Sequence, residues 1–461
     1  MERLNKGDLI DLKIEKIVNE GSGLAHYDGF AVFVSGVMAG ELVKCRILSS
    51  NKSYAKAELV EILETSPHRI KPFCPIFNAC GGCQWQFMDY EEQLVQKRLV
   101  VKDTIERIFG KELEILPVLG IKNNKNYRQK IQLPISQTKN SKRFLIGYYK
   151  ENSHELVNVK YCPIQPEYLN EVVEYIRQKA SELGLSAYCE KTKKGALRHI
   201  VFRNSTSEGK AVLTMVVNSD KVPNEVKTLA ESVFKAFEQI KGVVVNLNTS
   251  GSNLILTDEF CEICGESFIY QTIDTFTFKI SAGSFFQVNI EGARHLLDGV
   301  KKLVAVNTKN PTVLDAYCGV GSFGIWLKDI AKEIWLVEQA HSSIEDAKVN
   351  IELNNVKNAK IFEGDVKKIF EEFIQSGKEF DVVVIDPPRK GCDEDVREQL
   401  MKLAKKYIVY VSCNPATLAR DLRFFCDNGF SAESVQPVDM FCHSYHVESV
   451  VLLKRKNNNT R

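Results

Sequence analysis

The chain contains one stretch, PTVLDAYCGVGSFGIWL at residues 311–327, in which an apolar strand passes through a glycine-rich turn into a helix. Such a turn lets backbone N–H groups and a helix N-terminus approach a bound ligand closely. From about Phe278 onward, apolar strands alternate with helical stretches, which is the pattern of a doubly wound α/β domain. We therefore expect residues 278–461 to form such a domain and to bind a ligand at the carboxyl ends of its strands.

The glycine-rich turn is compatible with binding of either of two cofactors. Residues Gly319–Gly324 satisfy G-x-G-x-x-G, the pattern of a nicotinamide site. Glu338 ends the next strand, seventeen residues after Gly321, where a carboxylate can accept both hydroxyls of a ribose in NAD or in S-adenosylmethionine. Two later strand ends, DVVVIDPPRKG with Asp386 and IVYVSCNP with Cys413, favour S-adenosylmethionine, because a dehydrogenase has no evident need for either motif.

A thiol at a strand end suits methylation of a pyrimidine at C5. This carbon is too weakly nucleophilic to attack a sulfonium methyl group, but addition of a thiolate at C6 turns it into an enolate carbon. A base must then remove the C5 proton so that the thiol can leave. Glu448, in SYHVESVVLL, is the best-placed base, with His443 and His446 as nearby alternatives. The plain structural interpretations are a core thiol at Cys413 and a surface carboxylate at Glu448.

Four cysteines form a candidate metal or cluster site. Cys74, Cys80 and Cys83 are spaced C-x5-C-x2-C around Gly81–Gly82, and Cys162 lies in a second Cys-Pro context, YCPIQP. Four thiolates suit zinc or an iron–sulfur cluster. Zinc sites usually combine two C-x2-4-C pairs, whereas one tight trio with a distant single cysteine is more typical of a cubane. The spacing therefore favours a [4Fe–4S] cluster.

The rest of the chain divides by pattern. Residues 1–64 contain five short alternating runs punctuated by glycine, which predicts a small five-stranded β-barrel. Residues 65–277 are expected to form a central α+β domain with the cysteine cluster. A helix at about residues 88–110 is expected to pack on the catalytic domain, with an apolar stripe of Leu94, Leu99, Ile105 and Ile108.

Charge is nearly balanced overall. The 61 Lys and Arg against 59 Asp and Glu give a formal charge of +2, so a nucleic-acid surface requires local clustering. Residues 121–150 contain eight Lys and Arg and no acidic residue, interleaved with Tyr127, Phe144, Tyr148 and Tyr149. This pattern favours contact with nucleic acid. The alternative is a solvated strand pair whose aromatic residues face a core.

The sequence predicts a cytoplasmic protein without a membrane segment. No apolar run approaches the roughly 20 residues that span a bilayer, and the first residues lack the apolar core of a signal peptide. The thirteen cysteines are odd in number and scattered, so a disulfide framework is not expected.

Six motifs in order resemble those of bacterial RNA uracil-C5 methyltransferases, in the branch that methylates 23S ribosomal RNA. They are CPIFNACGGCQWQ with the later YCP, SAGSFFQVN, LDAYCGVGSFG, DPPRKG, SCNP and HVES. The resemblance covers nearly the whole chain. It implies an RNA-binding TRAM barrel at residues 1–64, a Rossmann-like methyltransferase domain at 278–461, and RNA as the partner of a monomeric enzyme.

The same resemblance implies specific residue roles. Cofactor contacts would come from Gln287, Tyr317, Glu338, Asp386 and also Asp365, with S-adenosylmethionine as cofactor. Cys413 would be the nucleophile and Glu448 the proton-abstracting base. The [4Fe–4S] cluster would be bound by Cys74, Cys80, Cys83 and Cys162.

Motif details separate near relatives. Enzymes that make 5-methylcytosine in RNA carry a cysteine where this chain has Arg389, and amino-group methyltransferases end that motif in an aromatic residue. Many bacterial tRNA methyltransferases lack the barrel and the cysteine cluster, which favours ribosomal RNA, whereas some cluster-bearing relatives act on tRNA. A tRNA methyltransferase is therefore the alternative.

Two other functional classes are possible, and one further contact with RNA is expected. The chain could be a non-catalytic RNA-binding protein of ribosome assembly, or an iron–sulfur redox enzyme with a nicotinamide cofactor. A uridine within folded RNA must be turned out of its stack to expose C6. Phe285 and Phe286 are expected to stack on that base or to fill its vacated place.

Overall fold

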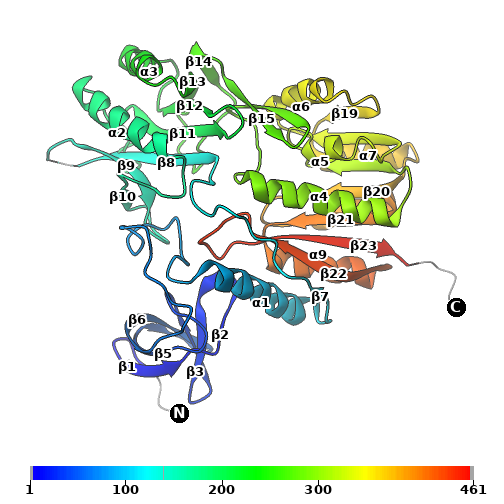
Figure 1. Cartoon of the computed structure of the whole chain (residues 1–461), viewed down its shortest axis with the longest axis horizontal. Helices are drawn as coiled ribbons and strands as arrows, with labels where there is room; N and C mark the ends of the chain where they lie inside the picture. Colours follow the sequence, from blue (N-terminus) through cyan, green and yellow to red (C-terminus); the bar gives the residue numbers. More distant parts are fainter. Residues whose placement is uncertain (1–3, 139, 457–461) are drawn as a thin grey trace.

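The computed structural model of the chain describes residues 4–138 and 140–456. A small curved sheet lies at the N-terminal end, a central sheet with two helices follows, and a large α/β unit contains the last strand (Figure 1). Within the described residues, no helix is both long and apolar enough to cross a membrane.

The N-terminal structure is a sheet of six strands: β1 (Leu9–Lys13), β2 (Lys16–Ile17), β3 (Gly23–Tyr27), β4 (Phe30–Val34), β5 (Leu42–Ser50) and β6 (Tyr54–Glu64). Its order is β1-β5-β6-β4-β3-β2, so its two edge strands follow each other in the chain. The first alternating run contains both strands, because it is interrupted at Ile14 and Glu15, and this explains six strands where five were expected. Residues such as Leu12 and Val32 form a core of its own.

The central structure is a seven-stranded sheet with two helices: β8 (Lys130–Gln137), β9 (Phe144–Tyr149), β10 (Leu156–Asn158), α2 (Glu167–Glu182), β11 (Leu197–Ser205), β12 (Lys210–Val217), α3 (Asn224–Ala236), β13 (Ile240–Leu247) and β14 (Phe260–Gly265). The strand order is β10-β9-β8-β11-β12-β13-β14, antiparallel except between β12 and β13. Helices α2 and α3 share one apolar core with residues such as Phe144, Phe202 and Met215. This is the expected α+β architecture.

A hairpin joins the central sheet to the α/β unit. It consists of β15 (Phe268–Ile273) and β16 (Phe276–Ser281). Its buried residues Ile269, Phe278 and Ile280 belong to the core of the α/β unit, to which Val212 and Val244 of the central sheet also contribute. The boundary between residues 277 and 278 falls inside β16, so we propose that the α/β unit begins at about residue 268.

The α/β unit is built on an eight-stranded sheet: β7 (Glu114–Ile115), β17 (Thr312–Ala316), β18 (Glu333–Glu338), β19 (Ala359–Glu363), β20 (Phe380–Ile385), β21 (Ala404–Ser412), β22 (Phe430–Val438) and β23 (Glu448–Arg455). The order is β19-β18-β17-β20-β21-β23-β22-β7. The first five strands in this order are parallel, and β23 runs antiparallel to both β21 and β22.

Helices cover both faces of this sheet, which confirms the doubly wound prediction (Figure 1). They are α1 (Tyr90–Phe109), α4 (Ile290–Asn307), α5 (Ser322–Trp326), α6 (His341–Leu353), α7 (Val366–Gln375), α8 (Glu394–Leu403) and α9 (Pro415–Asp427). Side chains of a strand alternate between faces. Accordingly, Val382 and Val384 pack with α4, α5 and the hairpin, whereas Val383 and Ile385 pack with α1, α7, α8 and α9.

Helix α1 comes from the N-terminal half but packs against α9, as expected from sequence. Asp89 caps its first turn, and Gly110, in the left-handed region, ends it. The expected apolar stripe is partly wrong, since Leu99 is 47% exposed while Val101, Ile105 and Phe109 enter the core. Another part of the buried face of α1 is polar and makes hydrogen bonds with a distant loop. The positions of the apolar residues therefore do not mark the whole buried face.

Candidate active site

The predicted site residues meet at one edge of the α/β sheet. Tyr317, Asp386 and Cys413 each directly follow a parallel strand, and Glu338 is the last residue of β18. Glu448 lies at the same edge because β23 runs in the opposite direction, so that its first residue is level with the ends of its neighbours. Register confirms this placement, since Ser412, beside the thiol, pairs with Ser449.

The glycine-rich turn is closed by two carboxylates. Glu338 Oε2 accepts from Gly319 N at 3.0 Å, and its Oε1 accepts from two further backbone N–H groups. Asp315 Oδ2 accepts from Gly324 N at 2.7 Å, and burial raises the pKa of Asp315 to about 8. Sequence reasoning missed Asp315, although an acidic residue in an apolar strand before a glycine turn was the signal. Tyr317 adopts a left-handed φ of 61°, which turns the chain sharply after β17.

A cavity lies over this turn. It is lined by Phe285, Phe286, Gln287, Tyr317, Cys318, Gly319, Val320, Ser322, Phe323 and Asp386. Gln287 Nε2 donates to Asp386 Oδ2 at 3.4 Å, and burial raises the pKa of Asp386 to about 7. Asp365 is not among the lining residues; it is exposed and caps α7 by accepting from Lys368 N. The structure thus brings Gln287, Tyr317 and Asp386 together at the cavity.

Hydrogen bonds with α6 anchor the loop that contains Phe285 and Gln287. Asp346 of α6 accepts from Ser281 N at 2.7 Å and from Ser284 Oγ at 2.6 Å. The anchored loop leaves Phe285 57% exposed but buries Phe286 at 4% exposure in the core. The stacking role expected for Phe286 is therefore wrong, because its ring already packs against other side chains.

Glu448 and Asp386 both act electrostatically on the Cys413 thiol. Burial, followed by the charges of Glu448 and Asp386, raises the pKa of the half-buried Cys413 thiol to about 11, and Arg389 opposes this shift. Burial and the charge of Asp386 raise the pKa of Glu448 well above its ordinary value. Glu448 is only 4% exposed, and its Oε2 has no hydrogen-bond partner. It is therefore not the surface carboxylate of the plain structural interpretation.

The two histidines are poor alternatives as bases. His443 is 3% exposed, and both of its ring nitrogens are engaged in hydrogen bonds away from the sheet edge. His446 packs against the rings of Phe441 and Tyr445. Burial lowers the pKa of each histidine to about 4.

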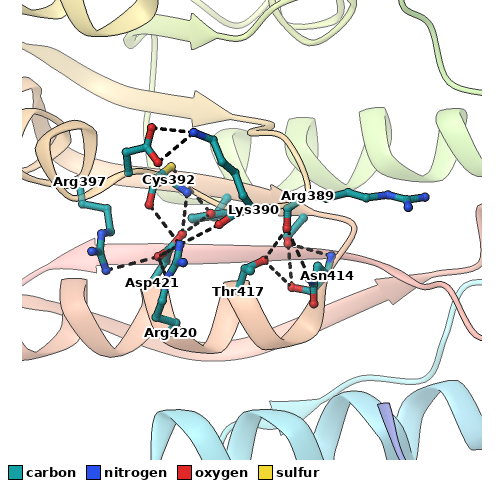
Figure 2. A network of polar contacts seen from close by, with 11 residues as sticks. Arg389, Lys390, Cys392, Arg397, Asn414, Thr417, Arg420 and Asp421 are labelled. Carbon is teal, nitrogen blue, oxygen red and sulfur yellow. Dashed lines mark hydrogen bonds and ion pairs between the residues drawn. The ribbon is translucent and has the colours of Figure 1, made fainter. Parts of the chain in front are cut away.

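The loop after β20 is fastened to α9 through Asp421 (Figure 2). Asp421 is fully buried and accepts from Cys392 N at 3.0 Å and from Tyr410 OH at 2.7 Å. Arg420 donates Nε to Asp421 at 2.8 Å, and Arg397 lies 3.5 Å from the same carboxylate. Cys392 is thus a buried member of this network.

A second set of contacts joins the same loop to the segment after Cys413 (Figure 2). Asn414 Nδ2 and Thr417 Oγ1 donate to the backbone oxygen of Arg389 at 3.4 and 3.3 Å. Gly391 has φ 73°, and a Cβ there would lie 2.7 Å from an oxygen of the Asp421 carboxylate. The loops that contain Asp386 and Cys413 are therefore held against each other by hydrogen bonds.

The four predicted cluster cysteines line one pocket. Cys74, Cys80, Cys83 and Cys162 surround it together with Arg128 and apolar side chains. Burial raises the pKa of Cys83 to about 12 and that of Cys162 to about 11. In the described part of the chain, no group of three or more His, Cys, Asp or Glu side chains is arranged to hold a metal ion.

The basic and aromatic stretch 121–150 is divided between surface and interior. Lys122, Lys125, Lys142, Arg143 and Lys150 are exposed, whereas Arg128 lines the cysteine pocket; Lys139 lies outside the described residues. Phe144 is fully buried in the central core, and Tyr127 is 7% exposed beside the cysteine pocket. For these two aromatic residues the core interpretation is correct, whereas Tyr148 and Tyr149 are half-buried, and the exposed cations remain available to RNA.

Similar proteins agree with this architecture. Residues 89–456 match the family described as tRNA (Uracil-5-)-methyltransferase, and residues 3–60 match the TRAM domain. An uncharacterized RNA methyltransferase of Halalkalibacterium halodurans is 38% identical over 98% of both chains, and one of Clostridium tetani is 38% identical over 98% of this chain and 97% of that protein.

Among solved structures, the chain resembles the tRNA (uracil-54, C5)-methyltransferase of Pyrococcus abyssi in complex with S-adenosyl-L-homocysteine. The TM-score is 0.75, and the sequences are 27% identical with coverage of 96% of this chain and 99% of that one. The strand-edge site, the TRAM domain and these matches over nearly the full length agree. The chain therefore belongs to the tRNA (uracil-5-)-methyltransferase family, whose members are S-adenosylmethionine-dependent RNA methyltransferases.

Proposed function

We propose that the protein methylates C5 of a uridine in RNA, with Cys413 as nucleophile and Glu448 as base. The observation that carries this proposal is a half-buried thiol and a buried carboxylate with an unpartnered oxygen at the same end of the adjacent strands β21 and β23. Both groups interact electrostatically with Asp386, which lines the cavity over the glycine-rich turn. A nicotinamide-dependent redox reaction would use neither group.

The residues have separate tasks in this reaction. Cys413 adds to C6 of the uracil ring, which makes C5 nucleophilic. S-adenosylmethionine, when bound, supplies the sulfonium methyl group that C5 attacks. Glu448 then removes the C5 proton, and the Cys413–C6 bond breaks. Because burial and Asp386 raise the pKa of Glu448, its carboxylate is a stronger base than an exposed one.

We propose that the cofactor binds in the cavity over the glycine-rich turn. We assign Gln287, Tyr317 and Asp386 to its contacts because they line the cavity. Glu338 lies beside them and is assigned to the ribose, although its oxygens here accept from the backbone. Asp365 is retained as a more peripheral contact, since it follows the end of neighbouring β19.

We further propose 23S ribosomal RNA as the substrate, with tRNA as the alternative. The N-terminal TRAM barrel and the cysteine pocket support ribosomal RNA through the motif resemblance described above. The barrel, at about residues 1–64, and the exposed cations of 121–150 would contact phosphates, which helps to offset the few kcal/mol needed to turn out a base. Phe285, which is exposed beside the cofactor cavity, would stack on that base. We expect a cytoplasmic monomer.

Methyl transfer to defined RNAs tests the reaction and the substrate together. The purified enzyme, incubated with labelled S-adenosylmethionine and unmodified 23S ribosomal RNA, should place label in 5-methyluridine, identified by mass spectrometry of nucleosides. With 5-fluorouridine in the RNA it should form a covalent complex, because fluorine cannot leave as a proton. Label only in tRNA would select the alternative substrate. Binding of RNA without label or covalent complex would indicate a non-catalytic protein.

We also propose a [4Fe–4S] cluster on Cys74, Cys80, Cys83 and Cys162. This proposal is supported by the pocket that all four thiols line together with the cation Arg128. The thiols are not arranged to coordinate a single metal ion. A cubane is larger than one ion and takes four thiolates. Burial favours the uncharged form of these thiols, so the free energy of cluster binding must compensate the cost of ionising them.

Protein purified without oxygen should contain about four iron and four sulfide ions per chain, with visible absorption that Cys162→Ser removes or strongly reduces. Since no step above requires an electron, reduction of the cluster should leave the rate of methyl transfer unchanged. Cys189→Ser serves as the control, because Cys189 is exposed and is not among the residues that line the pocket. Stoichiometric zinc in place of iron would contradict the proposal.

A further inference from the structure

The loop of residues 439–447, which connects β22 to β23, leads directly to Glu448. It lies where the α/β unit meets α1 and the segments around the cysteine pocket (Figure 1). Several segments from the N-terminal half of the chain contact it, among them α1, residues 84–85 and residues 119–127. Strand pairing places Glu448 at the sheet edge, and elements more than 300 residues away in the sequence hold the loop that precedes it.

Helix α1 contacts the beginning of this loop through buried polar side chains. Lys97 Nζ donates to Asp439 Oδ1 at 2.6 Å and to Phe441 O at 3.0 Å, and neither charged side chain is exposed. Tyr90 OH donates to Asp439 Oδ2 at 2.9 Å. Because positions 90, 93 and 97 are three and four residues apart, they share one face of the helix.

Gln93, between these two residues, contacts the strained centre of the loop. His443 has a φ of 64°, in the left-handed region that non-glycine residues rarely adopt. Its N–H donates to Gln93 Oε1 at 2.9 Å, and Gln93 Nε2 lies 3.3 Å from His443 Nδ1. His443 Nε2 lies 2.9 Å from Asn124 O, so a neutral ring that donates from Nε2 and accepts at Nδ1 satisfies both contacts.

The backbone oxygen of His443 connects the loop to the cysteine segment. It accepts from Gln84 N at 2.8 Å and from Trp85 N at 2.9 Å, the two residues that follow Cys83. In the neighbouring segment, Tyr127 OH donates to Cys442 O at 3.1 Å. The unusual backbone of His443 is thus maintained by contacts from three sides.

We infer that Gln93 is a positioning residue for Glu448, and that its loss impairs removal of the C5 proton rather than addition of Cys413. This inference rests on the proposed function. Cys413 lies between β21 and α9, and the loop after β20 is hydrogen-bonded to this segment through Asn414, Thr417 and Asp421 rather than through Gln93. Cys413 and Glu448 share the pairing of β21 with β23, but the hydrogen bonds that hold the loops beside them come from different side chains.

The test compares Gln93→Met with Gln96→Met. Both replace a buried glutamine of α1 by an unbranched side chain of similar length, but the Gln96 amide donates to Glu92 on the same helix and not to the loop. Two rates are measured for each enzyme on an RNA that the wild type methylates: formation of the covalent complex with 5-fluorouridine RNA, and turnover on ordinary RNA. Denaturing gels show whether methyl-labelled protein–RNA complex accumulates on ordinary RNA.

We expect Gln93→Met to form the 5-fluorouridine complex within about twofold of the wild-type rate, while turnover falls about tenfold or more and labelled complex accumulates on ordinary RNA. Gln96→Met should resemble the wild type in both. Equal loss of both rates in Gln93→Met, or no loss, would overturn the inference. A wild-type enzyme that forms no 5-fluorouridine complex would instead refute the proposed function, and the inference with it.

Discussion

Cys413→Ala is expected to abolish methyl transfer to uridine, by roughly 10⁴-fold or more, while binding of S-adenosylmethionine stays unchanged. In the proposed reaction this thiol adds to C6, and it is not among the residues that line the cavity over the glycine-rich turn. Rapid-quench assays with labelled cofactor measure the rate, and calorimetry measures cofactor affinity. Because the Cys413 pKa is about 11, the thiol is protonated at neutral pH, and the wild-type rate of 5-fluorouridine complex formation should rise with pH.

Cys426→Ala is the matched control for this substitution. Cys426 is a buried thiol on α9, at the far end of the helix from Cys413, and it belongs to the apolar core of the α/β unit. Its removal should lower stability slightly and leave the rate of methyl transfer near that of the wild type. If Cys413→Ala retained more than about one hundredth of the wild-type rate, covalent catalysis by this thiol would be refuted.

Glu448→Gln should separate the two halves of the reaction. The amide keeps the shape of the side chain but cannot accept the C5 proton, so turnover should fall by about 10²–10⁴-fold. Methylated RNA should remain attached to Cys413 and appear as a labelled protein–RNA band on denaturing gels. Glu433→Gln, at an exposed side chain of β22, is the control and should turn over normally.

The same substitution should not destabilise the protein. Burial raises the pKa of folded Glu448 above that of the unfolded chain, so ionisation opposes folding, and this cost grows as pH rises from the unfolded pKa toward the folded one. A neutral glutamine avoids the cost. The thermal midpoint of Glu448→Gln at pH 8 should therefore equal or exceed that of the wild type, and a clear decrease would show that the carboxylate has a structural role instead.

The parts of the site that could be predicted are those encoded by short sequence patterns. The glycine turn at Gly319–Gly324 and the strand ends at Asp386 and Cys413 follow from alternation and turn residues within short windows. In a parallel sheet these ends share one edge, so their proximity needs no further information. Asp365 shows the limit of this reasoning, because it also follows a strand yet caps α7 outside the cavity.

Long-range contacts could not be predicted in this way. Lys97 and Asp439 are 342 positions apart, and a pattern-based analysis has no signal that pairs them. Likewise, Phe285 and Phe286 are adjacent and chemically identical, yet one is 57% exposed and the other 4%. Only the path of the backbone around Asp346 distinguishes them.

The sequence by itself determined the doubly wound α/β unit, the N-terminal barrel and the types of chemical group at the site, because these depend on periodicity and on residues that follow strands. The tertiary structure decided how the N-terminal half contributes to that site. It placed α1, the cysteine segment and residues 121–127 around the loop before Glu448. The physical reason is that buried polar groups require partners, and their partners are chosen by the packing of distant segments rather than by neighbours in sequence.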